Sequence, residues 1–221
     1  MLAREILVVP SPEAARLLLG ALLVREDETG RRVGRIVETE AYAGPEDLAS
    51  HARFTSRARN AVMSGRPGIA YVYLVYGMYD CLNVVTGPPG RASAVLIRAV
   101  EPLEGVATMR DSRRRVGRRR RERSYPDGRC RHATSRPVPD RHLARGPGLV
   151  GACFGVDRSW TGTDLCDPAS VLRLEADPRA DDRPFAVTEG PRVGVRYAGL
   201  EWAGRPWRFA IDGHPSVSRA R

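Results

Sequence analysis

The sequence predicts a mixed α/β protein of the α+β type: a single compact domain over residues 1–221, with a largely antiparallel curved sheet, surrounding helices and a protruding β-hairpin. Three observations favour this class. A chain of 221 residues suits one domain. A composition of 42% hydrophobic and 28% charged residues is that of a globular protein. The apolar runs are short and separated by turn residues, which is typical of paired strands.

The N-terminal part is expected to hold one helix and two strands. Ser11-Pro12-Glu13 has the residues of a helix start, with Ser11 as the cap, and this helix should end near Gly20. The runs LLVRE and RRVGRIVETEAY predict two strands joined by the polar turn EDETG. A second short helix is expected to open at Pro45-Glu46-Asp47 and to run toward His51.

The middle and C-terminal parts predict further strands and one helix. The run IAYVYLVYGMYDCLNVV is broken at Tyr76-Gly77, which predicts a hairpin with Gly77 in the turn. SAVLIRAVEP predicts a strand, followed by a short helix from near Pro102. Gly146-Pro147-Gly148 predicts the start of a helix that runs to about Phe154. Three short strands are expected near the end: VLRLEA, RVGVRY and WRFAI.

All basic residues of the chain are arginine. The 36 arginines occur without one lysine, which excludes a P-loop of the GKS or GKT type and any lysine Schiff base. Arg110 to Arg145 holds fourteen arginines and four acids, so this segment carries the whole net charge of +10. We expect a disordered Arg-rich loop at about 111–142 that neutralises a nucleic-acid backbone. A solvated linker without a binding role is the alternative.

The cysteines and the apolar runs bear on location. Cys81, Cys130, Cys153 and Cys166 form no C-x-x-C pair, so we expect reduced thiols, no metal and no cofactor. No run of eighteen apolar residues exists, and the first twenty residues do not resemble a signal peptide. A cytoplasmic, bacterial-type, nucleoid-associated monomer without a membrane partner is expected.

The strand RIVETEAY carries candidate catalytic groups. Side chains alternate along a strand, so Glu38, Glu40 and Tyr42 should share one face. A carboxylate that is partly removed from water has a raised pKa and can act as a general base. The alternative is a pair of exposed acids that bind nearby arginines.

The predicted hairpin has four tyrosines in the nine residues YVYLVYGMY. Tyr76, Met78 and Tyr79 crowd a turn where small polar residues are usual. Proteins that bind nucleic acids insert such side chains between base steps and stack flipped bases on aromatic rings. A core role is the alternative, and it is favoured for Tyr71 but not for Tyr76.

Several ordered blocks of sequence resemble the alkyladenine (3-methyladenine) DNA glycosylase family. They are GRIVETEAYAGPEDLASH, RARNAVM, PGIAYVYLVYGMYDCLNVV, VLIRAVEPLEG, GPGLVGACFGV and GTDL. The resemblance runs from about Ala15 to Val217, apart from the Arg-rich loop. It implies a DNA repair enzyme that flips damaged purines out of double-stranded DNA and hydrolyses the N-glycosidic bond. The family's substrates are 3-methyladenine, 7-methylguanine, hypoxanthine and ethenoadenine.

The resemblance also implies roles for residues at the reacting bond and in the base pocket. Glu40 would be the general base that activates water, and Arg98 would lie near this water and the sugar-phosphate. Tyr42, His51 and Tyr73 would form the base pocket. Asn83 would be a further pocket residue that helps to decide which purines enter.

Other positions would contact DNA. Tyr76 would fill the gap left by the flipped base, Met78 would flank it, and Arg113 would match a basic site for the DNA backbone. Leu149 departs from the family, which commonly has lysine there.

The expected chemistry agrees with the residue types. Departure of a purine leaves a cation-like sugar, which a nearby carboxylate stabilises. An aromatic pocket favours an electron-poor alkylated ring. Without lysine, water is the expected nucleophile, so a monofunctional enzyme without lyase activity is predicted.

Two other interpretations remain at this point. The first is a non-enzymatic Arg-rich nucleic-acid-binding protein. The second takes ARGPGLVG as a helix-hairpin-helix motif with Asp157 as the catalytic acid.

Overall fold

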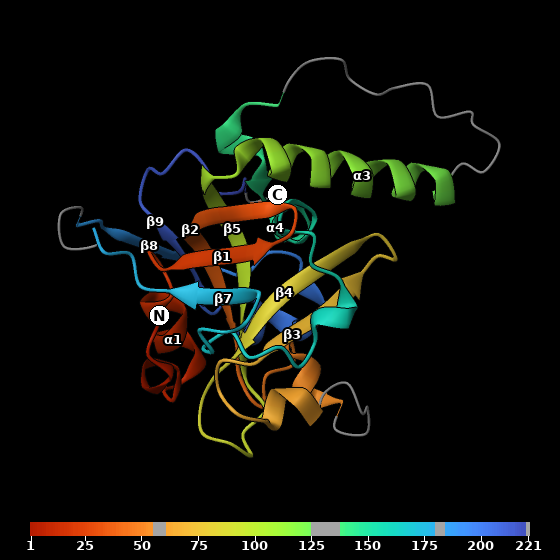
Figure 1. Cartoon of the computed structure of the whole chain (residues 1–221). Coiled ribbons are helices and arrows are strands. Elements are labelled where there is room, and N and C mark those ends of the chain that lie inside the picture. The colour runs from red at the N-terminus through yellow and green to blue at the C-terminus, as the bar shows by residue number, and fades with distance from the viewer. Residues whose placement is uncertain (55–60, 125–137, 180–183, 220–221) are drawn as a thin grey trace.

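The computed structural model (Figure 1) describes residues 1–54, 61–124, 138–179 and 184–219, with the backbone alone over 119–124. These residues form a nine-stranded sheet in which every pairing is antiparallel. The strands are β1 (Leu22–Asp27), β2 (Gly30–Tyr42), β3 (Ala70–Val75), β4 (Tyr79–Val85), β5 (Ala94–Glu104), β6 (Ala144–Arg145), β7 (Leu172–Glu175), β8 (Val187–Gly190) and β9 (Arg208–Ile211). The predicted α+β class with an antiparallel sheet is confirmed.

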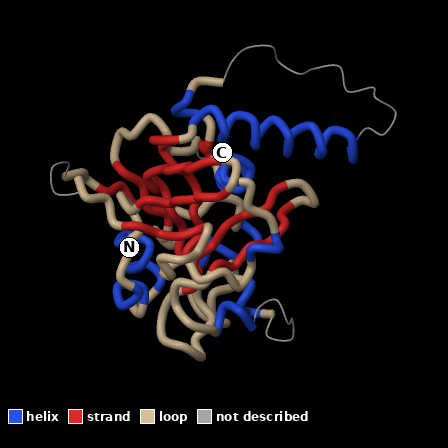
Figure 2. The backbone as a smooth tube through the Cα atoms, viewed as in Figure 1, coloured by secondary structure: helices blue, strands red, loops and turns tan. Residues whose placement is uncertain are grey.

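The long strand β2 organises the sheet. Along the main path the order is β3-β4-β5-β2-β1-β7. One edge of β2 pairs with β5, whereas the other edge pairs first with β1 and then, over Glu38 to Glu40, with β9. Register shifts between Ile36 and Thr39 interrupt the pairing with β5. Such irregularities increase the local twist, and the sheet curls as Figure 2 shows.

Helices cover the sheet from the outside. The α-helices are α1 (Ser11–Leu17), α3 (Val106–Ser124), α4 (Pro147–Phe154) and α5 (Gly199–Gly204). The short 3-10 helices are η1 (Arg4–Leu7), η2 (His51–Arg53), η3 (Val62–Ser64), η4 (Asp140–His142), η5 (Arg158–Trp160) and η6 (Arg196–Ala198). Helix α1 packs on β2, α4 packs on β4 and β5, and α3 packs on α4.

The core joins these layers around Phe154 and Phe209, whose side chains are fully buried. Helix α4 approaches β4 closely because Gly151 has no side chain. A Cβ there would lie 2.3 Å from the carbonyl oxygen of Asp80. This contact holds the start of β4, close to the tip of the β3–β4 hairpin, against α4.

Most elements lie where the sequence predicted them, including the β1–β2 and β3–β4 hairpins, β5, α4, β7 and β9. The start of α1 is a correction. Pro10, not Ser11, is the N-cap, and the Pro10 carbonyl accepts hydrogen bonds from the backbone N–H groups of Glu13 and Ala14. Ser11 is therefore already helical and does not cap with its side chain.

Two predicted helices are also wrong. Instead of a helix from Pro45, turns precede η2, because the Asp47 carboxylate accepts hydrogen bonds from the backbone N–H groups of Ala43 and Ala49. No helix opens at Pro102, because Pro102 still lies in β5 opposite Gly34 of β2. The helix begins after Gly105, which has φ +67°.

The predicted Arg-rich loop begins with helix instead. Residues 111–124 belong to α3, because arginine is a good helix former and Met109 and Ser112 bury one face of the helix. The loop prediction over 125–137 lies outside the described residues. The predicted strand RVGVRY is a loop that leads into η6, with Gly194 at φ +79°.

Candidate active site

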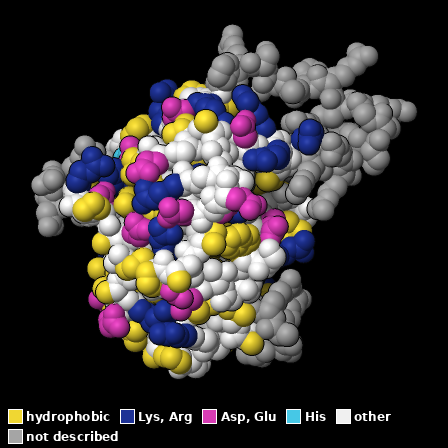
Figure 3. Space-filling model, viewed as in Figure 1, with side chains coloured by type: hydrophobic (Ala, Val, Ile, Leu, Met, Phe, Trp, Pro, Cys, Tyr) yellow, Lys and Arg dark blue, Asp and Glu magenta, His cyan; other side chains and the backbone are white. Residues whose placement is uncertain are grey.

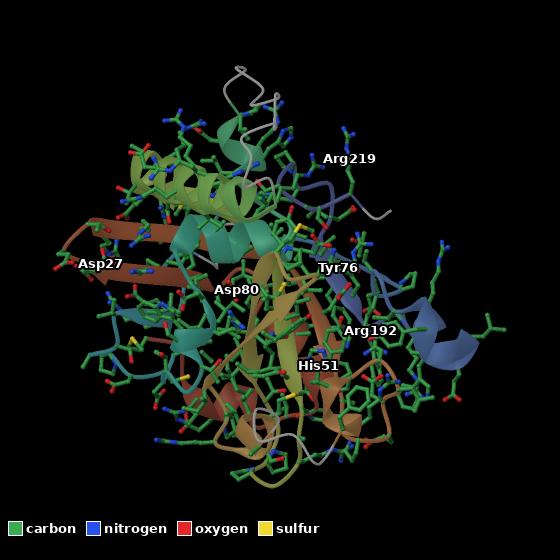
Figure 4. All side chains as sticks on the ribbon, turned by 90° about the vertical axis from the view of Figure 1, so that its right-hand side faces the viewer. Asp27, His51, Tyr76, Asp80, Arg192 and Arg219 are labelled. Carbon is green, nitrogen blue, oxygen red and sulfur yellow. The ribbon has the colours of Figure 1, made fainter. Side chains whose placement is uncertain are left out.

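A cavity of about 410 Å³ opens between the β3–β4 hairpin, the end of β2, β5 and the loop after Gly190. Its size is that of a small-molecule site. It brings together seven predicted site residues: Glu40, Tyr42, His51, Tyr73, Tyr76, Asn83 and Arg98. Figure 4 shows His51 and Tyr76 on the face of the molecule that contains this cavity. Residues from five separate parts of the sequence therefore meet here.

Glu40 lies on β2 and its side chain is fully buried. Its Oε1 accepts a hydrogen bond of 2.7 Å from the backbone N–H of Val193, and its Oε2 accepts one of 2.8 Å from the Tyr42 hydroxyl. Arg98 Nη1 lies 3.1 Å from Oε1. Burial raises the pKa of Glu40, although Arg98, Val193 and Tyr42 act in the opposite direction. The geometry is that of a buried carboxylate whose charged form is disfavoured by the loss of water.

Glu38 faces the same side of β2 and holds Arg98. It accepts hydrogen bonds from Arg98 Nε (3.0 Å), Arg208 Nε (2.9 Å), and both the backbone N–H (2.7 Å) and the hydroxyl (2.9 Å) of Ser218. Burial lowers the pKa of Arg98, but Glu40 and Glu38 outweigh it, so that the pKa is raised. Arg98 therefore stays charged between the two carboxylates. The two acids are buried, not exposed, although they do pair with arginines.

Aromatic side chains form one wall of the cavity. The rings of His51 and Tyr73 lie 4.5 Å apart between centroids in a T-shaped arrangement. His51 Nδ1 lies 3.0 Å from the Tyr71 hydroxyl, which is buried as the core interpretation expected. Burial raises the pKa of both Tyr42 and Tyr73, so the two phenols stay protonated. The wall thus combines two uncharged phenol rings with the His51 ring.

Asn83 and Cys81 lie on the adjacent strand β4. The Asn83 amide nitrogen donates hydrogen bonds to the carbonyl oxygens of Tyr71 (3.0 Å) and Cys81 (3.1 Å), which fixes the orientation of the side chain. Burial raises the pKa of the Cys81 thiol to about 12. The thiol is thus a neutral lining group at neutral pH.

The hairpin tip separates the cavity from solvent. Tyr76 lines the cavity, yet 78% of its surface is exposed, and its backbone has φ +52°. Met78, 41% exposed, lies on the opposite side of the hairpin and does not line the cavity. The tip therefore presents two large side chains that the described fold leaves exposed, Tyr76 more than Met78.

Three other predicted positions lie away from the cavity. Arg113 Nη1 donates hydrogen bonds to the carbonyl oxygens of His142 and Leu143, so it ties α3 to the segment before β6. Asp157 accepts hydrogen bonds from the backbone N–H and the hydroxyl of Ser159 at the start of η5.

Leu149 lies in the first turn of α4. Its neighbour Pro147 does line the cavity. The helix thus reaches the site through Pro147.

Sequence reasoning missed the contribution of the segment from Arg192 to Tyr197. The buried Arg192 forms an ion pair with Asp47 at 2.6 Å and lies 4.9 Å from the Tyr42 ring centroid. This anchor brings the Val193 N–H to Glu40 and the Tyr197 side chain to the cavity. Gly194 was the one available signal, because a positive φ suits a loop better than the predicted strand.

The described residues contain neither a candidate metal site nor a candidate membrane span. Cys81, Cys153 and Cys166 are free thiols, and Cys130 lies outside the described residues. Within the described ranges, no three His, Cys, Asp or Glu side chains gather as metal ligands would. No helix in the same part of the chain combines the length and apolar character that a membrane span requires.

Comparison with known proteins identifies what the chain is similar to. A family model described as methylpurine-DNA glycosylase matches residues 5–215. A 3-methyladenine DNA glycosylase, so named, of Anaeromyxobacter dehalogenans is 45% identical over 206 residues, which are 93% of this chain and 79% of that protein. A protein of the same name from Methanocella arvoryzae is 42% identical over 99% of this chain and 96% of its own length. The DNA-3-methyladenine glycosylase of Mus musculus is 40% identical over 95% of this chain and 58% of its own length.

Proposed function

The chain belongs to the methylpurine-DNA glycosylase family, and from this premise we propose that it hydrolyses the N-glycosidic bond of damaged purines in duplex DNA with a water that Glu40 activates. The observation that carries the proposal is the buried Glu40 carboxylate beside an aromatic cavity, with its pKa raised by burial. A carboxylate in this state can accept a proton at neutral pH more readily than an exposed glutamate.

The proposed step balances without a cofactor. The bond between the anomeric carbon and the purine nitrogen breaks, and its electron pair leaves with the purine. The water oxygen bonds to the anomeric carbon, and one water proton passes to Glu40. The negative charge of Glu40 also stabilises the cation-like sugar as the bond breaks.

The surrounding residues have separate roles in this proposal. Tyr42, His51 and Tyr73 hold the flipped purine, and an electron-poor alkylated ring gains most from their aromatic faces. Asn83 meets the edge of the base, and Tyr76 occupies the space that the base leaves in the duplex. A damaged pair opens at lower cost, which adds selectivity.

Water is the proposed nucleophile because the chain has no lysine to form a Schiff base. The product would be an abasic site with an intact backbone, released by a monofunctional enzyme without lyase activity. We propose that the protein acts as a monomer on cytoplasmic, nucleoid DNA.

The test measures release of free base from duplexes that each carry one lesion: 3-methyladenine, 7-methylguanine, hypoxanthine or ethenoadenine. The wild type should release at least one of them, and Glu40→Gln should release none. Asp157→Asn is the matched control and should keep wild-type activity, because Asp157 binds Ser159 outside the cavity. Absence of release by the wild type would contradict the proposal and favour a non-enzymatic binder. Full activity of Glu40→Gln would contradict the role proposed for Glu40.

A further inference from the structure

A second hollow of about 680 Å³ lies on the other side of the β3–β4 hairpin, and we refer to it as the arm groove. One side is formed by the hairpin residues Gly77, Met78 and Tyr79, and the other by Ser112, Arg115 and Val116 of α3. The hairpin is therefore a wall with Tyr76 toward the active-site cavity and Met78 toward the arm groove. Helix α3 leaves the body directly beside the element that is proposed to enter DNA.

Arginines are the main charged residues of the arm groove. Arg25, Arg32 and Arg115 line it. Asp27, which is not a lining residue, pairs with Arg25 at 2.7 Å and with Arg32 at 2.8 Å. Arg32 Nε is buried and makes no hydrogen bond within the described residues. Burial and the charges of Arg25 and Arg115 lower the pKa of Arg32 although Asp27 opposes them.

The two acids that line the arm groove have partners of their own. Asp80 lies 3.6 Å from Arg158, and Asp157 accepts two hydrogen bonds from Ser159. Figure 3 shows basic and acidic side chains mixed over the described part of the body on one face of the molecule. The excess of positive charge thus begins at the groove and continues along α3.

Helix α3 combines an anchored first part with exposed arginines among its described side chains. Its first part is anchored by Met109 and Ser112, which are buried. Arg114, Arg115 and Arg118 are exposed, and the sequence adds four further arginines between positions 119 and 123. Figure 1 shows α3 and the hairpin projecting from the same side of the molecule. At 1.5 Å per residue, the 19 residues of α3 span about 28 Å.

Bound phosphate would relieve the repulsion between the exposed arginines of α3. Arg114 and Arg118 are four residues apart, and like charges at this spacing destabilise an isolated helix. Bound phosphates remove this repulsion and release counterions. Met109 and Ser112 hold the first part of α3 on the body, whereas the exposed arginines that follow would gain stability from bound phosphate.

We propose that α3 is a phosphate-binding arm that contacts the duplex on the Met78 side of the hairpin, on one flank of the lesion only. The flank assignment rests on the proposed function, because it takes Tyr76 to mark the lesion. The contact itself is independent of sequence and damage. The affinity of the protein for an undamaged duplex therefore tests the contact between α3 and the phosphates separately from base release.

The test compares two triple variants that remove the same charge. Arg114→Ala/Arg115→Ala/Arg118→Ala removes the described exposed arginines of the arm. Arg16→Ala/Arg91→Ala/Arg179→Ala removes three exposed arginines that line neither the active-site cavity nor the arm groove. Far-UV circular dichroism and thermal melts establish that both are folded.

Affinity for an undamaged duplex is measured between 50 and 200 mM salt. With a slope of about −0.9 per phosphate contact, wild type should lose about 40-fold more affinity over this range than the arm triple. The control triple should keep the wild-type slope. Equal slopes for the two triples would overturn the arm.

A second measurement leaves every arginine of α3 in place and does not depend on the folding of the arm triple. Duplexes place the lesion near one end or near the other, with Glu40→Gln used to prevent turnover. Shortening one flank should weaken binding far more than shortening the other. Equal losses would overturn the one-sided arm, whereas failure of base release alone would leave the salt slopes as the decisive result.

Discussion

Two glutamates on one face of β2 have different surroundings, and this difference assigns their roles. Glu38 accepts hydrogen bonds from two arginines and from Ser218, so both of its oxygens are occupied. Glu40 faces the cavity with one N–H and one O–H donor beside Arg98. Environments that separate two neighbouring acids are typical of catalytic sites. In the proposed mechanism Glu38 would be a positioning residue that orients Arg98, and Glu40 would be the group that accepts a proton.

The pH dependence of base release should report these contacts. Glu40 must be ionised to act, so the rate should rise with pH through its pKa, which burial raises above 4.5. The charge of Glu38 raises this pKa and the Tyr42 hydrogen bond lowers it. Glu38→Gln should therefore move the acid limb of the profile to lower pH, and Tyr42→Phe should move it to higher pH.

Single-turnover release of 7-methylguanine is the measurement, because its fixed positive charge keeps the leaving group constant. Glu104→Gln, an exposed acid on β5, is the control and should leave the limb in place. Shifts of both variants in the same direction would contradict the assignment. A purely structural effect would lower the rate without moving the limb.

At the scale of elements, the hairpin tip has a residue that its backbone does not favour. Tyr76 has φ +52° and Gly77 has φ +66°, the turn geometry for which Asn-Gly is preferred. A side chain such as tyrosine costs about 1–2 kcal/mol in the left-handed region. Tyr76 gains little by burial, since 78% of it is exposed. Strain of this kind collects at functional sites.

Tyr76→Asn should therefore raise the free energy of unfolding by up to about 1 kcal/mol and lower base release by at least tenfold. Urea unfolding and single-turnover kinetics on one lesion duplex measure the two effects. Leu200→Asn removes an even more exposed apolar residue from α5 and should leave base release unchanged. If Tyr76→Asn lowers the free energy of unfolding, or leaves base release unchanged, then Tyr76 serves the structure of the hairpin turn and does not fill the space left by the flipped base.

The elements that sequence could predict are those with local signals. Alternation placed Glu38, Glu40 and Tyr42 together on β2, and Gly77 marked the hairpin turn. The donors on the two glutamates could not be predicted, because Val193 and Ser218 follow them by more than 150 residues. The strand predicted over 192–197 failed because the buried ion pair between Arg192 and Asp47, not a strand partner, fixes that segment.

At the scale of the whole molecule, charge is divided between a neutral body and one basic segment. Sequence arithmetic located the excess between Arg110 and Arg145, but repulsion among arginines predicted a loop there. The structure has α3 instead, because contacts of Met109 and Ser112 with the body support its first half. Tertiary packing outweighs local repulsion over that part of the segment.

The burial of the Glu40 carboxylate should lower the free energy of unfolding of the whole protein at neutral pH. Burial raises the pKa of Glu40 in the folded state, so between pH 4.5 and that pKa the folded protein binds more protons than the unfolded chain. The stability that this group contributes is present below pH 4.5 and is lost as pH rises through the folded-state pKa. Glu40→Gln cannot ionise and escapes this loss, so its free energy of unfolding relative to wild type should be more favourable at pH 8 than at pH 5.

Urea unfolding of both proteins at each pH gives this difference directly, and Glu104→Gln, which replaces an exposed acid, should show no such trend. The difference in the free energy of unfolding between Glu40→Gln and wild type could instead stay constant or become larger at acidic pH. Arg98, Val193 and Tyr42 would then compensate fully for the burial of Glu40, and Glu40 would be an ordinary ion-pair partner. If this difference grows with pH and Glu40→Gln has also lost base release, then Glu40 both lowers the stability of the fold and is required for base release. That combination distinguishes a functional buried acid from a structural one, because a structural pair is stabilising and its loss has the opposite sign.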